Sequence, residues 1–173
     1  MNDLNTHMTD RTINYEIDCP TIEDIPQLLD LWRQQYEYHH NIDPVYYASY
    51  SGDLNDRIRR YLEKTIQEDE DQEQILVAKD GNSLVGFITF TVGDESYFDS
   101  NIIRYGELKE LLVTEGVRGT GVGGALVKAV EKRFRSLGVP FAVIKCSSFN
   151  TNALAVYEKL GYTTRQEILY KPL

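Results

Sequence analysis

The stretch Val117–Leu126, VRGTGVGGAL, decides the fold, because it places four glycines within six residues directly before a helical pattern. A helix N-terminus carries unpaired N–H groups and a partial positive charge. Glycine also lets the backbone approach an anion closely. The stretch therefore predicts a turn that binds phosphate. A strand-to-helix connection, with glycines serving only tight packing, is the alternative.

Two other phosphate-binding motifs fit this stretch poorly. A P-loop requires G-x-x-x-x-G-K-[ST], and the chain contains no Gly-Lys pair. The dinucleotide fingerprint G-x-G-x-x-G matches at Gly119, Gly121 and Gly124, but residues 114–118 separate it from the preceding strand. The following strand also ends IKCSS, without the acidic residue that binds ribose. An NAD(P)-binding oxidoreductase is therefore disfavoured, and relative affinity for CoA and NAD(P)H would separate the two classes.

Hydrophobic periodicity outward from the glycines predicts alternating strands and helices. Thr21 and Asp24 resemble a capping box before the first helix, and Asp80-Gly81-Asn82 predicts a hairpin turn. Strands are expected at residues 12–18, 75–78, 84–92, 107–113, 140–146 and 162–169, and helices at 25–36, 53–67, 122–137 and 152–160. The order βααβββαβαβ indicates an α+β fold, a sheet flanked by helices. We expect a flexible tail over residues 1–10 and one domain over residues 11–173.

Composition narrows the class of protein. The formal net charge of −9 argues against a nucleic-acid partner, although it is equally explained by solubility. No apolar run approaches the length of a membrane span, and no signal peptide is evident, so we expect no membrane partner. The two cysteines, Cys19 and Cys146, favour a reducing, cytoplasmic setting. No Cys/His cluster has metal spacing, so no metal site is expected.

Two segments together resemble a known superfamily. VTEGVRGTGVGGALV is similar to the R/Q-x-x-G-x-G/A signature of the GNAT superfamily of acetyl-CoA-dependent N-acetyltransferases, with Arg118, Gly121 and Gly123 at the signature positions. NTNALAVYEKLGY resembles its second segment, and the element order agrees over roughly residues 11–173. The resemblance implies a mixed, mainly antiparallel sheet with a splayed central strand pair. It also implies acetyl-CoA as co-substrate.

The resemblance assigns the acetyl-CoA site residue by residue. The main chain of Leu111, Leu112 and Val113 would pair with the pantetheine arm, and an N–H there would polarise the acetyl carbonyl. Asn150 would contact the cofactor arm, beside Tyr157. The glycine turn would hold the pyrophosphate through Arg118, Gly119, Thr120, Gly121, Val122, Gly123 and Gly124.

The same resemblance suggests the catalytic groups. Tyr157 matches the family tyrosine that protonates the CoA thiolate; a packed aromatic ring is the alternative. For the base we favour Glu110 over Glu107, with ordered water or a merely solvated carboxylate as alternatives. The two glutamates are out of phase on a regular strand and should face opposite sides, unless a bulge intervenes.

The acceptor is the least determined part. Tyr36, Tyr38, Tyr46, Tyr47 and Tyr50 could line an acceptor pocket or pack a long loop, and His39 and His40 could act as a base or lie at the surface. We expect a small-molecule or peptide amine acceptor. A non-catalytic acyl-CoA-binding or regulatory domain is the alternative function. A homodimer is a further expectation.

Overall fold

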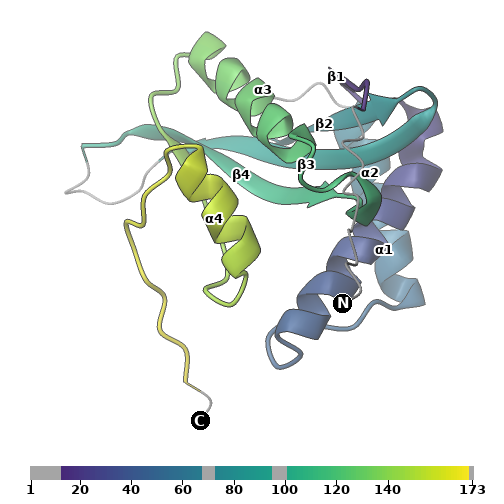
Figure 1. The fold of residues 1–173 in the computed structure, drawn as a ribbon, viewed down its shortest axis with the longest axis horizontal. Helices are drawn as coiled ribbons and strands as arrows, with labels where there is room; N and C mark the ends of the chain where they lie inside the picture. The colour runs from purple at the N-terminus through teal and green to yellow at the C-terminus, as the bar shows by residue number, and fades with distance from the viewer. Residues whose placement is uncertain (1–12, 68–72, 95–100, 172–173) are drawn as a thin grey trace, which may run out of the picture.

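The computed structural model describes residues 13–67, 73–94 and 101–171. Five strands form one sheet in chain order, antiparallel except for the parallel pair β4–β5 (Figure 1). The strands are β1 Glu16–Asp18, β2 Glu73–Asp80, β3 Ser83–Asp94, β4 Arg104–Val113 and β5 Ala142–Ile144. The helices are α1 Ile25–Ile42, α2 Gly52–Gln67, α3 Val122–Ser136 and α4 Thr151–Lys159, with short 3-10 turns η1 Ile22–Asp24 and η2 Glu115–Val117. The expected mixed, mainly antiparallel α+β fold is confirmed.

Helices cover both faces of the sheet, and each face has its own apolar cluster. On one face α1 and α2 pack on Val77, Phe87 and Leu112. Trp32 of α1 stacks on Phe87 with ring centroids 4.6 Å apart. On the other face α3 packs through its apolar stripe on residues of β2, β3 and β4. Figure 1 shows α3 on the opposite side of the sheet from α1 and α2, with α4 beside β4.

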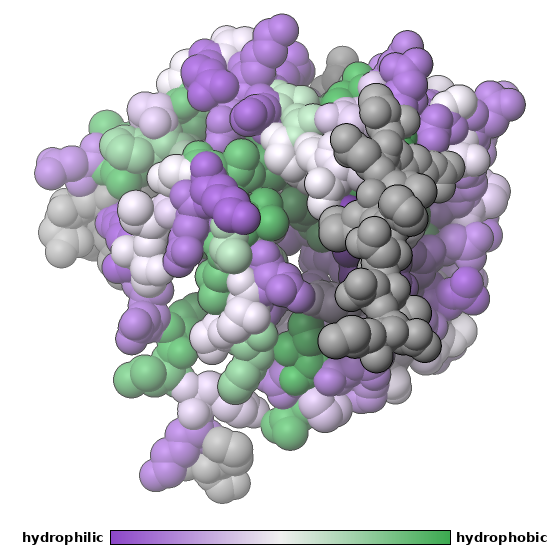
Figure 2. Space-filling model, in the orientation of Figure 1, coloured by the Kyte–Doolittle hydropathy of each residue, from purple (hydrophilic) through white to green (hydrophobic). Residues whose placement is uncertain are grey.

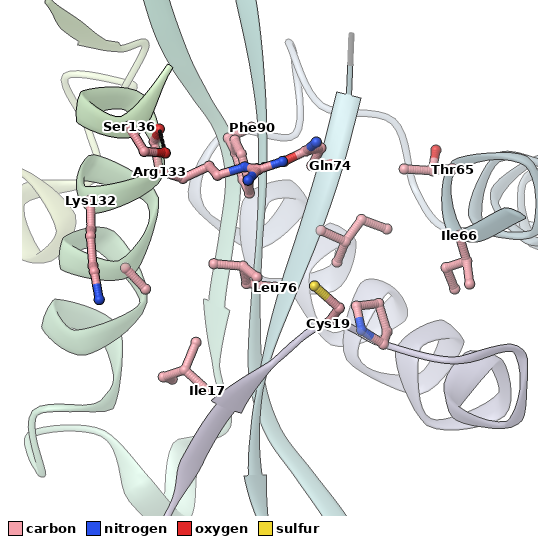
Figure 3. Close-up of a pocket in the computed structure, with 13 residues that line it drawn as sticks. Ile17, Cys19, Thr65, Ile66, Gln74, Leu76, Phe90, Lys132, Arg133 and Ser136 are labelled. Carbon is pink, nitrogen blue, oxygen red and sulfur yellow. Dashed lines mark hydrogen bonds between the residues drawn. The ribbon is translucent and has the colours of Figure 1, made fainter. Parts of the chain in front are cut away.

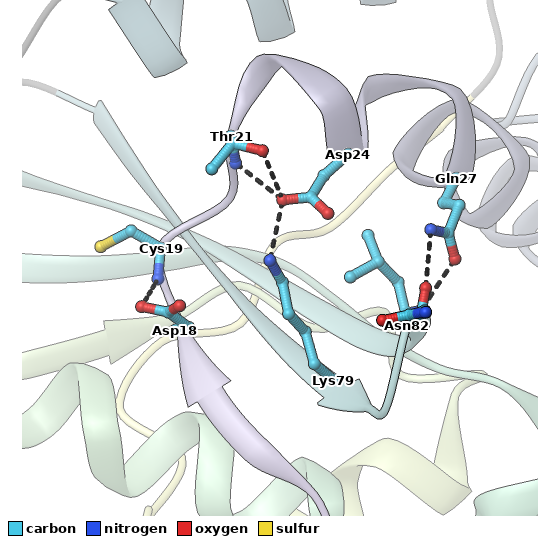
Figure 4. Close-up of polar contacts among 8 residues, drawn as sticks. Asp18, Cys19, Thr21, Asp24, Gln27, Lys79 and Asn82 are labelled. Carbon is cyan, nitrogen blue, oxygen red and sulfur yellow. Dashed lines mark hydrogen bonds and ion pairs between the residues drawn. The ribbon is translucent and has the colours of Figure 1, made fainter.

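The predicted capping box before α1 is present. Asp24 accepts hydrogen bonds from the Thr21 backbone N–H at 2.7 Å and the Thr21 hydroxyl at 3.1 Å. Lys79 of β2 reaches the same carboxylate at 2.9 Å (Figure 4). Burial alone would raise the pKa of Asp24, but these hydrogen bonds and the Lys79 charge together hold it below its usual value. The box therefore joins the start of α1 to the sheet.

The expected strand at residues 162–169 is wrong. Residues 162–171 form no strand or helix, and Ile168 and Leu169 are 87% and 92% exposed. Amino-acid alternation alone cannot specify a strand, because a strand also needs a neighbour with which to pair. The strands expected at 12–18 and 140–146 are shorter in the structure, and part of the expected loop at 93–106 belongs to β3 and β4. The expected tail, residues 1–10, lies outside the described residues.

Candidate active site

The sheet opens between β4 and β5. These strands pair through Gly106–Ala142, Glu107–Val143 and Leu108–Ile144, after which residues 110–113 pair with β3 alone. The main chain of Leu111, Leu112 and Val113 thus lies past the last β4–β5 pair. This is the splayed central pair that the sequence implied, and it offers strand backbone to a peptide-like arm.

A bulge in β4 changes which side chains face this region. Thr89 of β3 opposes Glu110 and Thr91 opposes Glu107, so one extra residue of β4 lies between these pairs. Since Thr89 and Thr91 are two residues apart, both glutamates lie on the same face of the sheet. The exception to opposite faces that the sequence left open, a bulge, is therefore present. Leu112, which packs against α1 and α2, shares this face.

The glycine turn connects η2 to α3. Gly119 and Gly121 have φ of +80° and +94°, in the left-handed region that other residues rarely adopt. Gly121 is the N-cap of α3, and no side chain caps this helix end. The Thr120 hydroxyl instead donates back to the Val117 carbonyl at 2.7 Å. The backbone N–H groups at the start of α3 are therefore not capped by a side chain, which is the arrangement that binds anions.

Arg118, Tyr38 and Asn150 connect three elements around the opening. Arg118 donates to the Val113 carbonyl at 3.0 Å, and its guanidinium lies 5.3 Å from the centre of the Tyr38 ring. The Tyr38 hydroxyl donates to the Asn150 amide oxygen at 3.3 Å. The same oxygen caps α4 by accepting from the Ala153 N–H at 3.2 Å. Both residues assigned to acetyl-CoA thus lie together with the end of α1.

Glu110 is held at both its backbone and its side chain. Its N–H donates to the hydroxyl of Thr89 at 3.2 Å, and Thr89 is fully buried. Its carboxylate accepts a hydrogen bond from the side-chain amide of Gln35, on α1. Because the carboxylate is half-buried and fixed, it has the features of a base with a defined direction.

Glu107 has a different environment, although it shares the face. Its carboxylate forms an ion pair of 2.8 Å with Lys145, which follows β5. The hydrogen bond and charge of Glu107 raise the pKa of Lys145. Lys145 is largely exposed, so the pair contributes little to stability. The Lys145 ammonium still binds the Glu107 carboxylate, and the ion pair links β4 to the residue after β5.

Tyr157 lies on α4 and is half-buried. Burial raises its pKa to about 12, with further contributions from Cys146 and Glu110. The phenol is therefore protonated near neutral pH and can donate a proton. Its coupling to Glu110 indicates that α4 and β4 bring an acid and a carboxylate into one region.

The tyrosines divide into two groups. Tyr36 and Tyr50 lie 6.1 Å apart and pack against the α1–α2 cluster. Tyr47 stacks on His39 at 4.8 Å and approaches Tyr46 at 5.0 Å. Burial raises the pKa of Tyr47 and of Tyr36, and Glu110 adds to both effects. Both rings therefore lie close enough to Glu110 to respond to its charge.

The two histidines are half-buried, not surface groups. Burial lowers the pKa of His39 below its usual value. The Nδ1 of His40 lies 2.8 Å from the Tyr47 carbonyl oxygen. Both rings thus help to position the loop after α1.

A cavity of about 580 Å³ lies away from these residues. It is bounded by α3, by the end of α2 and by β2 (Figure 3). Lys132 and Arg133 stand on its α3 side, and Arg133 donates to the Gln74 side chain at 3.4 Å. None of the expected site residues lines it, so the opening at β4 and β5 is the better candidate on chemical grounds.

The described part of the chain contains neither a metal-binding cluster nor a membrane-spanning helix. Within residues 13–67, 73–94 and 101–171, no group of three His, Cys, Asp or Glu side chains could hold a metal ion. No helix in that part of the chain is long and apolar enough to cross a membrane.

Sequence reasoning missed Gln35, Thr89 and Cys146. Gln35 lies 75 residues from Glu110 and Thr89 lies 21 residues away, so no local pattern reveals either contact. Cys146 follows β5, and burial raises its pKa. Its position as the last residue of the strand expected at 140–146 was the only available signal.

Comparison with known sequences adds an independent observation. A family model described as "Acetyltransferase (GNAT) family" matches residues 25–162, which include both signature-like segments. The uncharacterized N-acetyltransferase YjcF of Bacillus subtilis is 30% identical over 105 residues, 61% of this chain and 66% of the relative. A mycothiol acetyltransferase of Streptomyces coelicolor is 31% identical over 97 residues, 56% of this chain and 29% of the relative. The matches thus span less than two thirds of each of these relatives.

Solved structures share the fold over nearly the whole chain. A mutant protein of Bacillus halodurans superposes with a TM-score of 0.79 and 20% identity, covering 91% of this chain and 99% of the other. The aminoglycoside N-acetyltransferase AAC(6')-Iy, in complex with CoA, superposes with a TM-score of 0.75 and 16% identity. The superposition covers 94% of this chain and 97% of the other. At these identities the likeness concerns the fold alone.

Proposed function

Because the chain belongs to the acetyltransferase (GNAT) family, we propose that it transfers an acetyl group from acetyl-CoA to a primary amine. The acceptor would be a small molecule or a peptide. The observation that carries this proposal is the position of Glu110 at the opening between β4 and β5. The β4 bulge turns the glutamate toward α1, while α4 supplies a phenol whose pKa responds to that glutamate.

The residues present fit acetyl-CoA as a substrate. The N-terminus of α3 has no side-chain cap, and a Cβ built at Gly119 or Gly121 meets no atom closer than 3.9 Å. Gly119, Thr120, Gly121, Val122, Gly123 and Gly124 would bind it through their backbone, with Arg118 adding charge. The strand backbone at Leu111–Val113, which pairs only with β3, would bind the pantetheine arm. Asn150 would contact the same arm.

Transfer would proceed by direct attack of the amine on the thioester. Glu110 would take the proton from the ammonium group, since a protonated amine has no lone pair. A backbone N–H in Leu111–Val113 would stabilise the oxyanion. Tyr157 would protonate the thiolate as the C–S bond breaks, and the second proton that the nitrogen loses on forming the amide would restore the phenol through solvent. Direct attack is favoured over an acyl-cysteine intermediate, because burial raises the pKa of Cys146 and disfavours its thiolate.

Glu110 is preferred to Glu107 as the base. Both face α1 and α2, but the Glu107 carboxylate is engaged by Lys145. A base at position 107 would have to leave this ion pair before its carboxylate could approach the acceptor amine. The Glu110 carboxylate accepts a hydrogen bond from the Gln35 amide, and its charge acts on Tyr36.

We also propose a cytoplasmic homodimer. β5 is the last strand in the sheet order, so it forms an edge. Phe141, Val156, Ile168 and Leu169 are exposed large apolar side chains. Figure 2 shows apolar surface over the region of α4 and the C-terminal segment. A second copy would cover this surface. Two cysteines without a disulfide support a reducing compartment.

The first experiment measures CoA release from acetyl-CoA in the presence of polyamines, amino acids, aminoglycosides and short peptides. Blanks without acceptor correct for the thiols of Cys19 and Cys146. An amine-dependent rate that Glu110→Gln abolishes supports the proposal. Tight CoA binding with no release for any acceptor supports instead the non-catalytic acyl-CoA-binding alternative. Preference for NAD(P)H over CoA would contradict both.

A further inference from the structure

Gln35 is an unusual residue in its surroundings. Its side chain is 2% exposed, within a helix face that buries Leu28, Leu31 and Trp32. The amide nitrogen donates to the Glu110 carboxylate, whereas the amide oxygen is buried without a partner among the described residues. Half of the hydrogen-bonding capacity of this amide is therefore unsatisfied.

A buried amide that is only half satisfied opposes folding. A methionine of similar length would fill the same space without this penalty. Packing alone therefore gives no reason for a glutamine at position 35. The one interaction that requires an amide here is the hydrogen bond to Glu110.

Glu110 is thus fixed from two elements. Thr89 of β3 accepts from its backbone N–H, which holds the bulge, and Gln35 of α1 holds its carboxylate. Of the titratable groups, Tyr36 on α1, Tyr47 in the loop after it and Tyr157 on α4 respond to the Glu110 charge. Glu107 lies on the same strand face and Cys146 lies near Tyr157. If the Glu110 carboxylate could rotate freely, it would approach different ones of these titratable groups.

We propose that Gln35 is a positioning residue, which holds the Glu110 carboxylate in one orientation for proton transfer from the acceptor amine. This inference rests on the proposed function of Glu110 as the base. Gln35 acts through Glu110 and need not touch either substrate.

The test compares Gln35→Met with Gln34→Met. Gln34 is the adjacent, exposed residue of α1, so the control makes the same chemical change without touching Glu110. The side-chain carboxyl ¹³C shift of Glu110, assigned with Glu110→Gln, is followed by NMR as a function of pH in the full chain. Loss of the donor disfavours the ionised carboxylate, so the Gln35→Met midpoint should rise by about one to two pH units. Gln34→Met should titrate like wild type.

Kinetics with the best acceptor of the amine panel give the second readout. In Gln35→Met, the acidic limb of kcat/KM should move to higher pH by the same amount, and the rate should recover toward wild type at alkaline pH. In the Glu110→Gln background, Gln35→Met should have no further effect on the pH profile. Gln35→Glu, which adds a like charge, should move the limb further than Gln35→Met.

Two outcomes would overturn the inference, and they differ. If Gln35→Met leaves the Glu110 midpoint and the acidic limb unchanged while Glu110→Gln removes the limb, Gln35 has no positioning role but Glu110 remains the base. If Glu110→Gln keeps wild-type turnover and its limb, the base proposal fails and the role of Gln35 fails with it. A uniform loss of rate at all pH values, with a lower melting temperature, would indicate a structural role only.

Discussion

Tyr157 keeps its proton near neutral pH, because burial raises its pKa to about 12. Its own deprotonation therefore does not limit the reaction there, and the alkaline side of a rate profile should reflect other groups. A phenol fixed in this form suits the protonation of a leaving thiolate, which is itself a fair leaving group.

Replacing Tyr157 with phenylalanine tests this role. We expect kcat to fall by about 100-fold or less, at the lower end of general acid catalysis. The affinity for CoA should change less than kcat, because a phenylalanine ring can still pack against Tyr162. The ring centroids of Tyr157 and Tyr162 lie 6.0 Å apart. Steady-state kinetics and a CoA titration measure the two effects. Equal kcat in mutant and wild type would contradict the acid role.

Glutamine variants of Glu110 and Glu107 should differ in how much kcat/KM falls. Glu110→Gln should lower kcat/KM by about 100-fold or more near neutral pH and remove its acidic limb. Glu107→Gln should have a smaller effect, because its carboxylate is already bound by Lys145. The pH dependence of kcat/KM for both variants measures this. A larger loss in Glu107→Gln would reverse the assignment.

Individual residues were predictable where the signal was local. Thr21 and Asp24 form the expected capping box, and Gly121 lies in the turn directly before α3, as short segments of sequence indicated. The orientation of Glu110 was not predictable. It depends on a bulge, and a bulge is set by the register between two strands and not by the sequence of one strand.

At the scale of elements, the turn before α3 can be tested with a pair of glycines. Gly121→Val forces a β-branched residue to a φ of +94°, at a cost of about 1–3 kcal/mol. A Cβ there would have space, with only the Tyr15 hydroxyl at 3.9 Å, so the fold should survive while CoA binding is lost. Gly116→Val, where nothing lies within 4 Å and φ is not positive, should bind CoA normally. Calorimetric titration measures both; unchanged affinity in folded Gly121→Val would remove the phosphate assignment.

Packing of α3 on β4 depends on the absence of a side chain at Gly106. A Cβ at this position would lie 2.4 Å from the ring of Phe134. Gly106→Ala should therefore lower the free energy of unfolding by about 1–3 kcal/mol. Gly93→Ala is the control in β3, since its nearest neighbour is Tyr105 at 3.5 Å. Urea denaturation would show equal stability of the two variants if this packing argument is wrong.

Elements with strong local signals were predictable from the sequence. The capping box, the hairpin turn and the amphipathic stripe of α3 each fixed an element to within a few residues. Residues 162–169 alternate like a strand but have no partner strand in the structure. Pairing partners are a property of the assembled sheet, which explains this error.

For the whole molecule, the testable expectation is the homodimer. Light scattering should give a mass of about twice 19.9 kDa. Leu169→Lys should shift the protein toward the monomer, because Leu169 is 92% exposed within the proposed contact. Ile22→Lys is the control, because it makes the same change of charge at an exposed apolar residue of η1, distant in sequence. A monomeric mass at every concentration would contradict the dimer.

Because β5 is short, the region around β5 and α4 should unfold locally more easily than the rest of the molecule. β5 pairs through three residues, and α4 has no buried residue, whereas α1 and α3 bury six and five. Backbone amides of β5 and α4 should therefore exchange with deuterium sooner than those of β3. Two residues of the proposed acetyl-CoA site, Tyr157 of α4 and the N-cap residue Asn150, thus belong to a helix that its own packing orders weakly. A share of the binding energy would be spent on ordering it, so slowed amide exchange there is a signature of substrate binding that requires no knowledge of the acceptor.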